Sequence, residues 1–146
     1  MHYVSLMRHE KADETDAIGW FTNEHLRMSG AYWCIGSLKL IHKLDFERTK
    51  QSMVQFVKEC QNEDGGFGGN TGHDSHASSS LYALLVLSMF DSIDSIDLHG
   101  LAKYMASLQN KDGSFKGDAD GEVDTRFSYC VVSCLSLLGK LDLIDT

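Results

Sequence analysis

A short polar segment holds the residues whose types most suggest metal chemistry. The run Gly-His-Asp-Ser-His at 72–76 places two imidazoles and a carboxylate within four residues, and these groups bind zinc in many proteins. No cysteine stands at ligand spacing around it, and an apolar helical pattern follows directly. We therefore interpret the segment as a polar turn leading into a helix, with Asp74 or Ser75 near the N-cap, and predict neither metal ligands nor catalytic residues in this chain.

The glycine-rich run Gly65 to Gly69 could be taken for a loop that cradles a phosphate. It follows a helical pattern instead of a strand, however, and no Lys-Ser or Lys-Thr pair comes after it. We interpret it as a structural turn, because glycine reaches the left-handed conformations that such turns need.

Two further sets of residues could do chemistry. Glu122 and Arg126 stand four residues apart, a spacing suited to an ion pair at a helix start, with Asp124 as the cap. The cysteines are scattered through apolar helical patterns and form no CxxC pair, so we predict buried free thiols in a reduced compartment. They are Cys34, Cys60, Cys130 and Cys134.

The elements that would position these residues repeat along the chain. The segment Gln-Asn-Glu-Asp-Gly-Gly-Phe-Gly-Gly at 61–69 returns as Gln-Asn-Lys-Asp-Gly-Ser-Phe-Lys-Gly at 109–117, 48 residues later. The alignment needs no gap and pairs His76 with Asp124. It therefore predicts two units, about 49–94 and 97–142.

Each unit contains two helical patterns. The first helices, Thr49–Cys60 and Leu98–Gln109, have one apolar stripe, whereas the second, Ser78–Phe90 and Thr125–Leu138, are apolar around most of their circumference. Ser29–Leu44 resembles a second helix without its partner. The prediction is an all-α fold of two and a half α-hairpins, with the second helices as an inner layer of an incomplete ring. Aromatic residues near the turns are assigned to core packing: Trp33, Phe67, Phe115 and Phe127.

Composition excludes some partners. The chain has 146 residues and a net charge of −8, and this charge would repel a nucleic-acid backbone. No apolar run approaches the roughly 20 residues of a membrane span, and the N-terminus lacks the apolar core of a signal peptide. We divide the chain into a polar N-terminal segment, 1–23, and the repeats, 24–146.

The repeated Gln-x-x-Asp-Gly-Gly-Phe-Gly-Gly pattern resembles that of protein prenyltransferase β subunits. The resemblance spans Glu24 to Asp145. Within this family it is strongest to the Rab geranylgeranyltransferase (type-2) β subunit, at His25–Trp33, Cys60–His76 and Leu108–Ser128.

This resemblance implies an α/α toroid whose inner helices line an apolar isoprenoid cavity. It also implies a cytoplasmic enzyme that pairs with an α subunit, uses geranylgeranyl diphosphate and receives Rab proteins from an escort protein. A zinc ion would activate the substrate thiol. The family's zinc and diphosphate ligands belong to later repeats, so the expectation is an N-terminal part that binds no zinc and does not catalyse transfer by itself.

The resemblance also implies roles for single residues. Ser29, Leu81 and Tyr129 match positions that line the isoprenoid cavity; the first two fit a geranylgeranyl chain, whereas tyrosine at the third is typical of farnesyltransferase. Glu122 and Arg126 match residues that help hold a substrate C-terminus in farnesyltransferase. The alternatives are inner-helix packing for the first three and a plain ion pair for the other two.

There are two alternatives to this function. A triterpene-cyclase relative would need an acidic Asp-x-Asp-Asp motif and tryptophans where this chain has Phe67 and Phe115. A non-catalytic binding module, such as a short form that pairs with an α subunit, could be formed by the residues that the chain has.

Overall fold

The computed structural model describes residues 23–145 of the chain. The N-terminal segment expected at 1–23 lies outside this range except for Asn23. Within the described residues there are five α-helices, three short 3-10 helices and no strand, which confirms the all-α prediction. No helix in this range is long and apolar enough to cross a bilayer.

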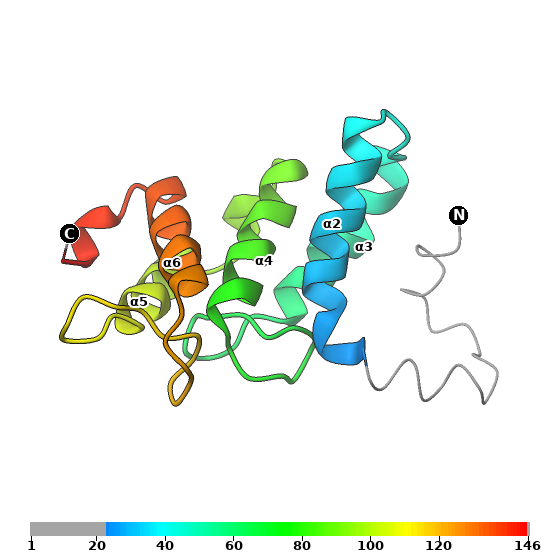
Figure 1. The fold of residues 1–146 in the computed structure, drawn as a ribbon. Coiled ribbons are helices and arrows are strands. Elements are labelled where there is room, and N and C mark those ends of the chain that lie inside the picture. The colour runs from blue at the N-terminus through cyan, green and yellow to red at the C-terminus, as the bar shows by residue number, and fades with distance from the viewer. Residues whose placement is uncertain (1–22, 146) are drawn as a thin grey trace.

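The helices form two layers. Figure 1 shows α2 (Arg27–Leu40), α4 (Ala77–Met89) and α6 (Thr125–Leu137) side by side in one row, with α3 (Phe46–Glu59) and α5 (Leu98–Ser107) behind it. The row α2–α4–α6 is the predicted inner layer, because α4 contacts both α2 and α6. The 3-10 helices are short connections at Glu24–Leu26, Ile93–Ser95 and Leu141–Leu143.

The apolar patterns explain which helix goes into which layer. The outer helices bury a single stripe, which in α3 consists of Met53, Phe56 and Val57. The central helix α4 is enclosed on several sides and buries seven of its thirteen residues: Ala77, Ser80, Leu81, Ala83, Leu84, Val86 and Leu87. The start predicted for α3 at Thr49 is wrong by three residues, because the Asp45 side chain caps an earlier turn by accepting from Arg48 N at 3.2 Å.

The glutamine of each repeated motif ties one unit to the next. Gln61 Nε2 donates to Asp97 O at 3.0 Å, and Gln61 Oε1 accepts from Asp97 N at 3.0 Å. Gln109 makes the same pair of hydrogen bonds with Asp145, at 2.8 and 2.9 Å. Because Asp97 is the N-cap of α5, the two hydrogen bonds between Gln61 and Asp97 fix where the next outer helix begins.

The glycines that follow the motif glutamine allow a close approach between units. Gly65 and Gly113 hold the same left-handed conformation, with φ of 89° and 86°. A Cβ at Gly65 would in addition collide with the backbone of Gly100 in α5, whereas Gly113 has no atom nearby. The interpretation of the glycine run as a structural turn is confirmed.

Three of the four aromatic residues assigned to the core are buried. Phe67, Phe115 and Phe127 are almost fully covered. The assignment of Trp33 is wrong: its side chain is 62% exposed. The Trp33 ring lies 4.9 Å from that of Tyr32 and 6.4 Å from that of Tyr82 on α4, and these neighbours leave most of it open to solvent.

Exchanging the two equivalent glycines for alanine separates conformational strain from steric overlap. Gly113→Ala should cost about 1–2 kcal/mol of unfolding free energy, the cost of a left-handed alanine. Gly65→Ala carries the same strain and also the clash with Gly100, which adds about 1–3 kcal/mol. Urea unfolding of both variants measures the difference. Equal losses would contradict the tight contact at Gly65.

Candidate functional site

A cavity lies at the N-terminal ends of two inner helices. It has a volume of about 530 Å³ and opens between α2, α4 and the loop that joins α3 to α4. Its walls carry imidazole, hydroxyl and carboxylate groups around one phenol ring. The residues are His25, Leu26, Ser29, Gly69, Gly72, His73, Asp74, His76, Ser78, Ser79 and Tyr82.

His76 is the N-cap of α4, and the expectation that Asp74 or Ser75 would cap it is wrong. The Nδ1 atom of His76 accepts from Ser78 N at 3.2 Å. Ser75 is buried instead and donates to Asp64 Oδ1 at 2.8 Å, while Asp74 is exposed. The repeat alignment contained this signal, because it pairs His76 with Asp124, the N-cap of α6.

The His76 ring also contacts the second unit. It stands edge-on to Phe127, with ring centroids 5.2 Å apart, and Nε2 would lie 2.7 Å from a Cβ at Gly117. Burial lowers the pKa of His76 below its usual value, against the opposite effect of the Asp118 and Glu122 carboxylates. The neutral ring, which can accept at Nδ1, is therefore the form that the fold favours.

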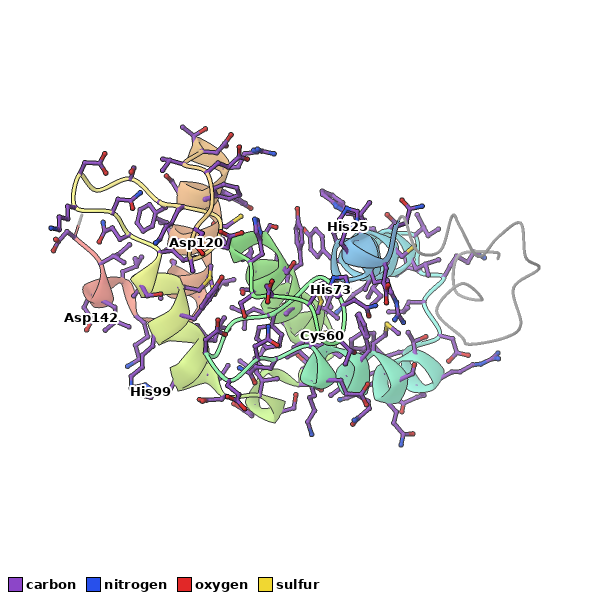
Figure 2. All side chains as sticks on the ribbon, turned by 90° about the horizontal axis from the view of Figure 1, so that it is seen from below. His25, Cys60, His73, His99, Asp120 and Asp142 are labelled. Atoms are coloured by element: carbon purple, nitrogen blue, oxygen red, sulfur yellow. The ribbon has the colours of Figure 1, made fainter. Side chains whose placement is uncertain are left out.

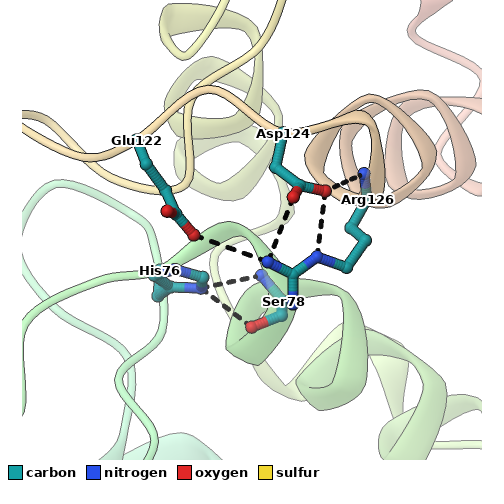
Figure 3. A network of polar contacts seen from close by, with 5 residues as sticks. All are labelled: His76, Ser78, Glu122, Asp124 and Arg126. Carbon is teal, nitrogen blue, oxygen red and sulfur yellow. Dashed lines mark hydrogen bonds and ion pairs between the residues drawn. The ribbon is translucent and has the colours of Figure 1, made fainter.

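A small ionic network faces this ring from the start of α6 (Figure 3). Arg126 Nε donates to Asp124 Oδ1 at 2.9 Å, and Arg126 Nη2 lies 3.4 Å from Glu122 Oε1. Hydrogen bonds from Arg126 lower the pKa of Asp124. The predicted ion pair and the Asp124 cap are both confirmed. All three groups are open to solvent, so the network adds little stability, and a role in holding a substrate stays a prediction.

The structure places the three predicted lipid-pocket residues differently. Ser29 lines the cavity, and its Oγ donates to Leu26 O at 2.9 Å. Leu81 is 1% exposed and belongs to the core, whereas Tyr129 is 67% exposed on α6. Leu81 and Tyr129 occupy equivalent positions of the repeat. Their exposure differs because α4 is followed by another inner helix, whereas α6 is not followed by one in the described residues. Their contact with an isoprenoid stays a prediction.

An aromatic cluster on the inner row was missed from the sequence. The rings of Tyr32 on α2 and Tyr82 on α4 stack with centroids 5.0 Å apart, and Trp33 stands edge-on to Tyr32 at 4.9 Å. Tyr82 also lines the cavity. The signal was the repeat itself, since Trp33 and Tyr82 occupy corresponding positions near the starts of two inner helices.

No metal centre is formed by the residues that the structure describes. Among residues 23–145, no three His, Cys, Asp or Glu side chains are grouped to hold an ion. Figure 2 shows His25 and His73 near α2 and Cys60 close by, while His99, Asp120 and Asp142 lie toward the other end of the molecule. The Cys60 thiol is buried, which raises its pKa to about 11, so it stays protonated. The described residues therefore do not form a site that fits the zinc implied by the resemblance.

The lowered pKa of His76 predicts a loss of stability in mild acid. The unfolded chain takes up a proton near pH 6.5, before folded His76 does, so unfolding becomes easier as the pH falls below that value. His76→Asn keeps a capping side chain but does not titrate. Urea unfolding at pH 7.5 and 5.5 should show a larger loss for the wild-type chain than for His76→Asn. Parallel losses would mean that His76 is not the titrating group.

Comparisons with known proteins agree with this geometry. The family model described as "Prenyltransferase alpha-alpha toroid domain" matches residues 6–146. A protein of Dictyostelium discoideum named "Probable geranylgeranyl transferase type-2 subunit beta" is 47% identical over 55 residues, which are 38% of this chain and 16% of that protein. "Geranylgeranyl transferase type-2 subunit beta 1" of Arabidopsis thaliana is 44% identical over 65 residues, which are 44% of this chain and 19% of that protein.

The aligned segments thus span less than a fifth of each of these two relatives, whereas the family model covers nearly the whole chain. The two-layer row of α-hairpins is consistent with part of the α/α toroid that the family description names. The resemblance to prenyltransferase β subunits is therefore confirmed, and the chain belongs to the prenyltransferase α/α toroid family.

Proposed function

We propose that this chain is part of a geranylgeranyl transferase type-2 β subunit and that its inner helices form a section of the wall against which the isoprenoid lies. The observation that carries the proposal is the similarity to relatives that all bear this name, in segments 42–47% identical. The full protein would transfer a geranylgeranyl group to cysteines of Rab proteins, together with an α subunit and an escort protein, in the cytoplasm.

The side chains of the inner row support a wall of this kind. Tyr32, Trp33 and Tyr82 place aromatic carbon at the α2–α4 seam, and Ser29 leaves room beside Tyr82 in the cavity. An isoprenoid gains about 25 cal/mol for each Å² of apolar surface removed from water. The inner row therefore contributes isoprenoid binding and the exclusion of water.

The zinc ion proposed for the full protein would lower the pKa of the substrate cysteine and present a thiolate to the isoprenoid diphosphate. Its ligands are not proposed among residues 23–145. The described residues take part by shaping the apolar surface beside which the isoprenoid is held.

The proposal is tested by competition between two isoprenoid diphosphates. The full-length protein that contains this chain is co-expressed with the α subunit of a type-2 geranylgeranyl transferase, and displacement of a fluorescent isoprenoid diphosphate by geranylgeranyl and farnesyl diphosphate is measured. We expect geranylgeranyl diphosphate to compete better. Leu81→Trp should shift the preference toward farnesyl diphosphate, because the indole fills space that the fifth isoprene unit needs.

Leu84→Trp is the matched control, because Leu84 is as deeply buried on the same helix. Both substitutions should lower stability by about 1–3 kcal/mol through overpacking, and only the first should change the preference. An equal change in both variants would reduce Leu81 to a packing residue. Absence of any isoprenoid binding by the wild-type complex would contradict the proposed function.

A further inference from the structure

A second cavity lies beside the outer helix α5, at the junction of the two repeat units. It has a volume of about 420 Å³, within the range of sites for small molecules. None of its lining residues belongs to an inner helix. They come from the first motif turn, from α5 and its end, and from the second motif with the loop after it: Asp64, Lys103, Tyr104, Ser107, Leu108, Lys116 and Ala119. Both units lie wholly within the described residues, so the cavity is bounded by two neighbours that are both present.

Tyr104 brings to this cavity a hydroxyl group that packing does not require. The residue is 7% exposed, and its Oη atom has no hydrogen-bond partner among the described residues. The equivalent residue of the first unit, 48 positions earlier, is Phe56, which is 8% exposed. A phenyl ring therefore fills this position of the repeat equally well, whereas a buried hydroxyl without a partner is unfavourable.

The Tyr104 ring is held in place, and its hydroxyl is a hydrogen-bond donor. A Cβ at Gly66 would lie 2.7 Å from Tyr104 Cδ1, so the ring packs directly on the backbone of the first motif turn and has no room to turn toward another partner. Burial raises the pKa of Tyr104 above its usual value, and the charges of Asp64 and Asp118 raise it further. The hydroxyl therefore stays protonated and offers its hydrogen to an acceptor.

Two lysines add further unused donors. Lys103 has no hydrogen-bond or ion-pair partner in the part of the chain that the structure describes. Lys116 Nζ donates to Ala119 O at 2.7 Å, which leaves two of its N–H groups free. Because Lys103 lies on α5 and Lys116 in the second motif, the two ammonium groups come to the cavity from different elements.

The acceptors around the cavity are largely occupied. Asp64 Oδ1 accepts from Gly66 N and from Ser75 Oγ, both at 2.8 Å. Ala119 O accepts from Lys116, as described above. The free hydrogen-bonding capacity of the cavity is thus mainly that of donors, and two of the three donor side chains are positively charged. The matching ligand is an anion with several acceptor oxygens.

We propose that this cavity binds a phosphate group, either as the free anion or carried by a small organic molecule, with Lys103, Tyr104 and Lys116 as donors. Two ammonium groups balance the charge of about −2 that a phosphate group carries near neutral pH, and lysine binds phosphate as a point charge. Three donor side chains suit a tetrahedral phosphate better than a planar carboxylate, which has only two oxygens. The volume of the cavity leaves room for several carbon atoms beside the phosphate.

Protection of lysines from acetylation tests the proposal on the full-length protein that contains this chain. Rates of labelling by N-hydroxysuccinimidyl acetate are measured by mass spectrometry in inorganic phosphate, glycerol 3-phosphate or succinate, against sodium chloride of equal ionic strength. At saturation, phosphate should slow the labelling of Lys103 and Lys116 about fivefold, because each ammonium group is held by the anion. Lys111, an exposed lysine that does not line the cavity, should react at an unchanged rate.

The three anions distinguish the possible ligands. Protection at a lower concentration of glycerol 3-phosphate than of inorganic phosphate would support an organic phosphate, and equal concentrations would support the free anion. Succinate should protect less than either. Equal protection by succinate, equal protection of Lys111, or no protection by either phosphate compound would overturn the proposal.

Tyr104→Phe separates a built site from general attraction of phosphate to lysines. Because Phe56 shows that the ring packs without a hydroxyl, the variant should unfold at a temperature no lower than the wild type. Half-maximal protection of Lys103 and Lys116 should need about tenfold more phosphate, since a hydrogen bond to a charged group is lost. Lys111→Met is the matched control and should leave the protection unchanged. Unchanged protection in folded Tyr104→Phe would overturn the proposal.

Discussion

The architecture depends on how closely the backbone can approach at the glycine-rich turn between the outer and inner helix of a unit. At Gly65 the chain takes a left-handed conformation directly against Gly100 of the next outer helix, a position that admits no side chain. The reciprocal hydrogen bonds of Gln61 and Asp97 fasten the same place. A turn that joins two helices of one unit therefore also locates the first helix of the following unit.

Because this turn is repeated, the inner helices of successive units lie side by side in a row. The carbonyl groups of Gly69 and Gly117 accept from the first turns of the preceding inner helices, so α2 and α4 are each held to the loop of the unit that follows. Contacts of this kind couple nearest neighbours only, which is the basis of stability in repeat folds. The central helix α4 has a neighbour on both sides and is accordingly the most deeply buried element.

Equivalent positions in the two units carry different residues, although their backbone geometry is the same. His76 and Asp124 both cap an inner helix, but the first is a partly buried imidazole and the second a carboxylate paired with Arg126. Leu81 and Tyr129 stand at one register position, the first covered and the second open. The backbone therefore sets where a side chain points, and the neighbouring unit sets what surrounds it.

The sequence by itself determined the features that depend on neighbouring residues along the chain. Apolar periodicity located the helices and their layers, and the glycine run marked the turns, because helix formation and left-handed turns are local events. The family resemblance came from the same repeated motif. The Asp124 cap with its Arg126 pair was also predictable, since all the atoms lie within one helical turn.

The tertiary structure decided the features that depend on distant segments. His76, and not Asp74 or Ser75, caps α4, because Ser75 is drawn into the turn by Asp64 and His76 N donates to Phe67 O. Trp33 is exposed despite its aromatic character. Its burial would require a further neighbour besides Tyr32 and Tyr82, and whether an apolar residue meets such a neighbour is a property of packing between units that no local pattern contains.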